Sequence, residues 1–140
     1  MAARVLFVAR KPYEDYLSLI AAADVVLDPF PYGGATTTYD ALSLGKPIVT
    51  LPSQYQRGRY TLGCYEKIEV LDCVASSPDQ YVELACRLGT DRDWREAVME
   101  RIGATAHLLF EDIETVRQYE RFFEQAVEAA RRQRTGRPCE

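Results

Sequence analysis

The sequence contains little histidine, no long apolar run and no paired cysteines, and each shortage excludes a class of protein. Its 140 residues include a single histidine, His107, and four cysteines that form no Cys-x-x-Cys pair. A zinc site needs such ligands at metal-binding spacing, so we expect no bound metal. No apolar stretch reaches the roughly 18 residues that span a bilayer, and the apolar run before Arg10 is too short for a signal peptide. We therefore expect neither a membrane protein nor a secreted disulfide scaffold.

A basic face is also lacking. Lys and Arg number 17 against 21 Asp and Glu, which gives a formal net charge of -4. Nucleic-acid binding favours a strongly basic surface, so we expect no nucleic-acid partner. The arginines that do cluster stand at the C-terminus, where residues 132–140 are predicted to form a flexible basic tail. Cysteines scattered without a pattern are typical of a reducing compartment, which predicts a cytoplasmic location.

Short apolar runs alternate with helical patterns along the chain. Its length and its hydrophobic fraction of 47% fit one globular domain, which we place at residues 1–131. Strands are predicted at residues 5–8, 24–28, 47–51 and 70–75. Helices are predicted at residues 12–21, 36–44, 59–67, 78–88, 91–107 and 114–131, the last with an apolar stripe along one face. This alternation predicts an α/β fold, a Rossmann-like parallel sheet flanked by helices, ending in a long C-terminal helix.

The segment from Asp24 to Asp40 is the one that points to chemistry. It predicts a strand, a loop rich in Pro and Gly, and the start of a helix. Ligands of open α/β sheets bind at the carboxyl ends of strands, and a helix N-terminus there favours phosphate. Gly33 and Gly34 permit a close backbone approach, the threonines at 36–38 add hydroxyl groups, and Asp40 lies within reach of a ribose. The segment is neither a Walker loop nor a dinucleotide-binding Gly-x-Gly-x-x-Gly, and an ordinary capped helix remains the alternative.

The same residues resemble a known family. The run Asp28-Pro-Phe-Pro-Tyr-Gly-Gly-Ala-Thr-Thr-Thr-Tyr-Asp-Ala-Leu, followed by Gly45-Lys-Pro-Ile-Val-Thr50, is similar to the C-terminal region of the O-linked N-acetylglucosamine transferases. The similarity is greatest to their bacterial, SPINDLY-like relatives in glycosyltransferase family 41, and it covers roughly residues 4–130. The resemblance implies the GT-B fold, in which two Rossmann-like lobes face each other. This chain would then be the C-terminal portion of the lobe that binds the nucleotide sugar.

The resemblance also implies roles for particular residues. Thr36 and Thr37 match a pair that grips the donor diphosphate, and Asp40 matches a carboxylate on the ribose. Tyr16 falls where the family has an aromatic residue or histidine against the base, although packing on a helix face explains it as well. Ala35 stands where many members have His or Gly, so only its backbone N–H is left to contact phosphate. The remaining candidates for donor binding are Gly34 and Thr38, with Lys11, Pro12 and Arg59 as further ones.

The implied activity is the inverting transfer of a sugar from a nucleotide donor to Ser or Thr of a protein. UDP-N-acetylglucosamine is the expected donor, with GDP-fucose and UDP-glucose as alternatives, and no cofactor or metal is expected. The basic residue that neutralises the leaving diphosphate lies upstream of Arg4 in the family. The acceptor site lies in the other lobe and in helical repeats. We therefore expect no catalytic residue in this chain and no turnover from it alone.

Two other interpretations remain open. The chain can be a nucleotide-binding or protein-interaction module without catalysis. A response-regulator-like domain would need an acidic pair after its first strand and a lysine after its last, and this arrangement is missing. An incomplete sheet would also expose an edge strand and apolar surface, which predicts self-association through that edge.

Overall fold

The computed structural model describes residues 4–135, and these divide between two compact units. Within the described residues, the first unit spans residues 4–109 and the second spans residues 110–135. The predicted flexible tail lies partly outside the described residues, at 136–140. Helix α6 continues through the tail's first residues, 132–135, to Thr135.

A small parallel sheet lies inside the first unit. Strand β1 (Val26–Leu27) pairs with strand β2 (Ile48–Val49), and Val26 lies opposite Ile48. Helix α2 (Thr36–Ser43) connects the two strands. A parallel pair needs such a crossover, and the α/β prediction is confirmed.

The predicted strand at residues 70–75 is reduced to one bridge. Val74 pairs in parallel with Thr50, and no longer ladder forms. Residues 72–73 form a turn instead, where the Asp72 carboxylate pairs with Arg101 at 2.8 Å. Asp72 therefore interrupts the strand that the apolar residues on either side of it would favour.

The predicted buried strand at residues 5–8 is wrong. These residues form no strand, and their side chains are 57–97% exposed. Leu27 of β1 is also 53% exposed. A β-rich sequence becomes a strand only when a neighbouring strand offers hydrogen-bond partners, and among the described residues β1 pairs only with β2.

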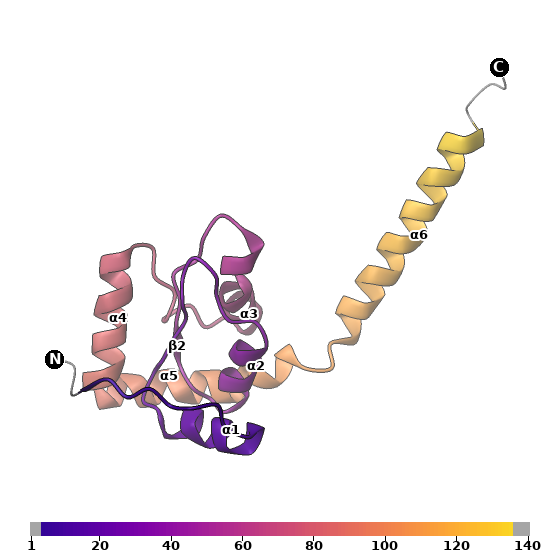
Figure 1. Cartoon of the computed structure of the whole chain (residues 1–140). Coiled ribbons are helices and arrows are strands. Elements are labelled where there is room, and N and C mark those ends of the chain that lie inside the picture. Colours follow the sequence, from indigo (N-terminus) through magenta and orange to yellow (C-terminus); the bar gives the residue numbers. More distant parts are fainter. Residues whose placement is uncertain (1–3, 136–140) are drawn as a thin grey trace. The chain divides into compact units, whose positions relative to one another are not determined.

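Helices flank both sides of the sheet. Figure 1 shows α4 on one side of β2 and α2 with α3 on the other. The remaining bounds in this unit are α1 (Tyr13–Ala22), the 3-10 turn η2 (Gln56–Gly58), α3 (Tyr60–Ile68), α4 (Pro78–Thr90), α5 (Arg92–Thr105) and the 3-10 turn η3 (Ala106–Leu109).

The core forms where these helices meet the strands. Tyr65 of α3 is fully buried, and its hydroxyl donates to the carbonyl of Ile48 at 3.0 Å and accepts from its N–H at 2.8 Å. The phenol thus satisfies backbone groups of β2 that would otherwise be buried without partners. The same core cluster contains the buried apolar side chains of Leu42, Ile68, Leu88, Val98 and Ile102.

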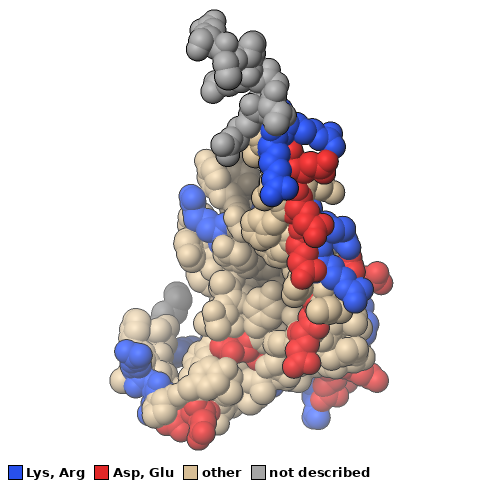
Figure 2. All heavy atoms as spheres, turned by 90° about the vertical axis from the view of Figure 1, so that its right-hand side faces the viewer, with Lys and Arg blue, Asp and Glu red and all other residues tan. Residues whose placement is uncertain are grey.

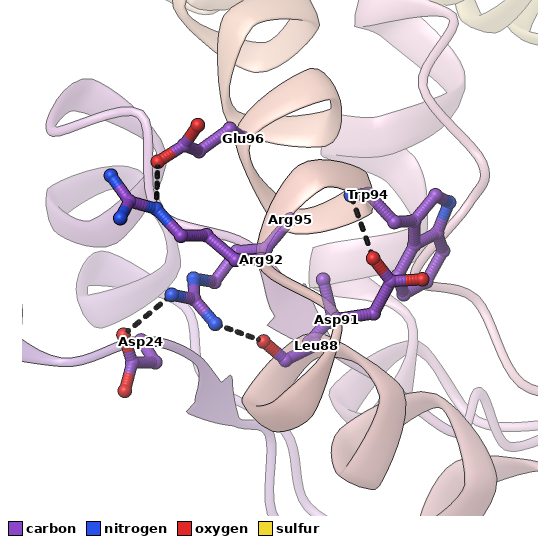
Figure 3. A network of polar contacts seen from close by, with 7 residues as sticks. All are labelled: Asp24, Leu88, Asp91, Arg92, Trp94, Arg95 and Glu96. Carbon is purple, nitrogen blue, oxygen red and sulfur yellow. Dashed lines mark hydrogen bonds and ion pairs between the residues drawn. The ribbon is translucent and has the colours of Figure 1, made fainter.

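A polar network joins the end of α4 to the start of β1 (Figure 3). The Arg95 guanidinium donates to the carbonyl of Leu88 at 2.7 Å and pairs with Asp24 at 3.2 Å. Asp91 caps α5 by accepting from the N–H of Trp94 at 3.1 Å. The Arg95 contacts thus link the end of α4 to the segment that precedes β1.

The second unit consists mainly of α6 (Ile113–Thr135). Its large apolar side chains are half or more exposed, namely Ile113, Val116, Tyr119, Phe122, Phe123 and Val127. Figure 2 shows a column of charged side chains with uncharged ones beside it. The helix is thus amphipathic, as its sequence predicts. Among residues 4–135, no helix is both long and apolar enough to cross a membrane.

Candidate functional site

The loop between β1 and α2 is anchored by Asp28, the residue that directly follows β1. Its carboxylate accepts from the N–H of Gly34 at 2.6 Å and from the hydroxyl of Thr50 at 2.7 Å. Its own N–H donates to the carbonyl of Val49, and its carbonyl accepts from the hydroxyl of Tyr81 at 3.0 Å. Every polar group of Asp28 is therefore bonded, and the loop is tied to the end of the sheet.

The loop that contains Arg57 and Gly58 contacts the loop between β1 and α2. The N–H of Gly33 donates to the carbonyl of Arg57 at 2.9 Å. Gly58 lies so close that an added Cβ would come within 2.8 Å of the Pro31 carbonyl oxygen and 2.3 Å of the Ser53 hydroxyl. Real Cβ atoms do not approach backbone at that distance, so a glycine is required at this contact.

The N-terminus of α2 is open at its first turn. Ala35, Thr36 and Thr37 are exposed, and no side chain caps the helix. In the described part of the chain, no acceptor is bonded to the N–H groups of Thr36 and Thr37. Free amides, hydroxyls and the positive end of the helix dipole together form a site suited to an anion such as phosphate.

Thr38 belongs to the interior. It is 2% exposed, and its hydroxyl lies 2.9 Å from the hydroxyl of Thr61 on α3. Successive helical residues point about 100° apart, so Thr36 and Thr37 are exposed while Thr38 is buried. In this arrangement the hydroxyl of Thr38 links α2 to α3. It is therefore not available for the predicted contact with the donor.

Asp40 lies beside two tyrosines of α1. The hydroxyl of Tyr13 donates to the Asp40 carboxylate at 2.7 Å, and this hydrogen bond raises the pKa of Tyr13. The ring centroids of Tyr13 and Tyr16 are 6.2 Å apart. Partial burial, with a smaller contribution from the Asp40 charge, raises the pKa of Tyr16 as well. Both phenols therefore stay neutral at pH 7 and can donate hydrogen bonds or stack.

Sequence reasoning did not select Tyr13. The signal was its place in the first turn of the helix that begins after Pro12, three residues before Tyr16. Residues three apart on a helix share a face. If Tyr16 lies on the surface near Asp40, Tyr13 is therefore expected to lie there as well.

The further candidates lie at the starts of two helices, α1 and α3. Pro12 is the N-cap of α1, while Lys11 is exposed. Arg59 is exposed at the start of α3, and its guanidinium reaches the carbonyl of Ser53 at 3.5 Å. A shallow hollow of about 290 Å³ is lined by Val8, Ala9, Arg10, Lys11, Tyr16 and Leu19. Among residues 4–135, no group of three or more His, Cys, Asp or Glu could hold a metal ion.

The sequence profile of glycosyl transferase family 41 matches residues 1–120. The chain belongs to this family. The match covers the loop from Asp28, the first turn of α2 and the tyrosines of α1, and the resemblance found in the sequence is confirmed.

Named relatives give the same family. The chain is 34% identical over 77 residues to the probable UDP-N-acetylglucosamine–peptide N-acetylglucosaminyltransferase SPINDLY of Petunia hybrida, covering 55% of this chain and 8% of that protein. It is 31% identical over 100 residues to the UDP-N-acetylglucosamine–peptide N-acetylglucosaminyltransferase of Giardia intestinalis, covering 71% of this chain and 7% of that one.

A solved structure is similar as well. An O-GlcNAc transferase mutant of Thermobaculum terrenum superposes with a TM-score of 0.77 at 27% identity, over 88% of this chain and 25% of that chain. The Rossmann-like fold prediction, as the C-terminal part of a GT-B lobe, is confirmed by this match. The chain spans less than a tenth of the length of these curated relatives and a quarter of the solved one.

Proposed function

We propose that this chain forms the donor-binding part of a protein O-glycosyltransferase, with the diphosphate of a UDP-sugar bound at the N-terminus of α2. The observation that carries the proposal is the open first turn, where Thr36 and Thr37 are exposed and their amides have no acceptor among the described residues. The relatives whose names state a UDP-N-acetylglucosamine donor support this sugar first. GDP-fucose and UDP-glucose remain alternative donors.

The rest of the nucleotide would extend toward α1. Asp40 would accept hydrogen bonds from the ribose through the carboxylate oxygen that Tyr13 does not occupy. Tyr16 would lie against the base, with Lys11 and Pro12 beside it and Gly34 and Ala35 offering backbone at the phosphates. Arg59 would supply positive charge from the neighbouring loop.

Transfer to Ser or Thr needs parts that this chain does not supply. A leaving diphosphate requires a positioned cation or donors that strengthen in the transition state, which contribute several kcal/mol. In the family that basic residue lies upstream of Arg4, and the acceptor is bound by the other lobe and by helical repeats. We propose that the isolated chain binds donor without turnover, in a cytoplasmic setting where Cys64, Cys73 and Cys86 remain free thiols.

Calorimetric titration tests the diphosphate site. The wild-type chain should bind UDP at least about tenfold more tightly than UMP, because the second phosphate gains the amides and hydroxyls of the first turn. Thr37→Ala should remove most of that preference. Thr90→Ala, which removes an exposed hydroxyl at the end of α4, is the matched control and should leave the preference unchanged.

Equal affinities for UDP and UMP, or no binding of either at millimolar concentration, would refute the donor-binding proposal. Preference for GDP over UDP would keep the diphosphate site and change the donor. If the chain binds the nucleotide but no longer protein that contains it transfers a sugar, the non-catalytic module would be favoured.

We also propose that the chain associates with a second copy of itself. The edge of β1 and the apolar residues 5–8 are exposed in the described structure, and an exposed edge next to β-forming residues favours pairing with a second copy. Light scattering should show dimers or larger species at about 100 μM. A monomer at that concentration would contradict the expectation.

A further inference from the structure

Asp28 is a charged side chain in the interior, next to the proposed anion site. It is 5% exposed, although a buried carboxylate is costly unless it is fully bonded. We propose that Asp28 is a positioning residue that fixes Gly34, and through it the first turn of α2, in the geometry that receives a diphosphate. This inference rests on the proposed donor site and assigns the residue that builds it.

Both carboxylate oxygens of Asp28 are used, each toward a different part of the fold. Oδ1 accepts from the N–H of Gly34 at 2.6 Å, one residue before the N-cap of α2. Oδ2 accepts from the hydroxyl of Thr50, the buried residue that follows β2. The carboxylate thus ties the loop ahead of the helix to the carboxyl end of the neighbouring strand, across 22 residues of sequence.

The packing around Gly34 leaves little freedom. An added Cβ on Gly34 would meet the Thr37 hydroxyl at 2.6 Å and the Thr38 hydroxyl at 2.9 Å, while one on Gly33 would come within 3.0 Å of the Asp28 carboxylate. The Asp28 carboxylate, Gly34 and the threonine hydroxyls are therefore layered in contact. A shift of Gly34 would displace Thr37, which carries the proposed phosphate contact.

Electrostatics excludes a direct role in binding. A negative charge close to a diphosphate weakens its binding, so Asp28 cannot favour the anion through its charge. Its effect must come from the geometry that its two hydrogen bonds hold. An amide in the same place can accept from Gly34 with its oxygen and donate to the Thr50 oxygen with its nitrogen, so geometry and charge can be separated by substitution.

The experiment measures the ratio of the affinities for UDP and uridine in the full 140-residue chain by calorimetry. Asp28→Ala should lower this ratio by about tenfold or more, since a hydrogen bond to a charged group is lost. Asp28→Asn should keep the ratio within about twofold. Val98→Ala is the control for a merely structural effect, because it removes buried packing on α5 and should leave the ratio unchanged.

A second readout needs no nucleotide. In the ligand-free protein, the Gly34 amide proton should exchange slowly and resonate downfield, and both properties should be lost in Asp28→Ala and kept in Asp28→Asn. If Asp28→Ala does not fold, Thr50→Val removes the Oδ2 contact alone and should lower the UDP-to-uridine ratio by about threefold.

The outcomes separate the two proposals. A wild-type preference for UDP that persists in Asp28→Ala, or that falls equally in Val98→Ala, overturns the positioning role and keeps the donor site. Absence of any preference in the wild type overturns the donor site itself. A Gly34 amide unaffected by Asp28→Ala overturns the positioning role independently of nucleotide binding.

Discussion

The hydroxyl of Tyr13 and the carboxylate of Asp40 form a hydrogen bond that the donor site would use. Tyr13→Phe removes the donor at 2.7 Å and leaves Asp40 less oriented toward a ribose. We expect the preference for UDP over its 2′,3′-dideoxy analogue to fall by about threefold, the modest effect of an exposed hydrogen bond. Competition titration measures it, with Tyr119→Phe on α6 as the control. An unchanged preference would show that the Tyr13 hydroxyl does not orient Asp40 for ribose binding.

Cys73 makes stability depend on pH in the alkaline range. Burial raises the pKa of its thiol to about 12, from an ordinary value of 9.0. Well below pH 9 the thiol keeps its proton in both states, and its contribution to stability is constant. Between pH 9 and 12 only the unfolded thiol ionises, so the free energy of unfolding falls by up to about 1.4 kcal/mol per pH unit.

Urea denaturation between pH 8 and 10.5 measures this slope. Cys73→Ala should be less stable at pH 8 because of the lost packing. Its decline above pH 9 should be shallower, with the remainder due to other groups whose pKa values are raised, among them Cys64 and Tyr65. Parallel curves for the two proteins would show that Cys73 does not titrate in this way.

Among the candidate residues, the residue types could be predicted from the sequence but not their orientation. Thr36, Thr37 and Thr38 are alike in sequence, and only the helical rotation and the partner Thr61 place the third in the interior. The anchoring by Asp28 was also out of reach, because its partner Thr50 is distant in sequence. Whether the exposed pair binds phosphate stays a prediction.

At the scale of elements, the end of α2 depends on one glycine. Gly45 has a φ of +67°, and its N–H and that of Lys46 donate to the carbonyls of Leu42 and Ala41. Gly45→Ala should lower the free energy of unfolding by about 1 kcal/mol, because a Cβ disfavours this left-handed conformation. Thermal or urea unfolding measures the difference.

Gly63 provides the opposite control. It lies within α3, and an added Cβ would meet nothing within 4 Å. Gly63→Ala should therefore stabilise the protein by up to about 1 kcal/mol through helix propensity. Equal effects of the two substitutions would contradict the assignment of Gly45 as a conformational requirement.

Local patterns predicted the helices better than the strands. Helix α4 begins at Pro78 behind the Ser77 cap, which is visible in the sequence. The segment at residues 5–8 has equally good strand residues, yet its side chains are exposed. Helices satisfy their backbone internally, while a strand depends on a neighbour that the local sequence does not specify.

At the scale of the whole molecule, the expected activity depends on how much of the length of its relatives this chain spans. The chain spans 8% of the Petunia hybrida relative and 25% of the solved Thermobaculum terrenum chain. Incubation with UDP-N-acetylglucosamine and a Ser/Thr peptide should yield no glycosylated product by mass spectrometry. Product above a protein-free control would contradict the assignment of catalysis to other parts of the enzyme.

The central claim is that a diphosphate binds at the first turn of α2. The most direct measurement is the titration of UDP into the ¹⁵N-labelled chain, followed by amide chemical shifts. The account predicts the largest shifts at Gly34, Ala35, Thr36 and Thr37, smaller ones at Tyr16 and Asp40, and reduced shifts at residues 34–37 when uridine replaces UDP. Shifts confined to other residues, or the same pattern with uridine, would contradict it.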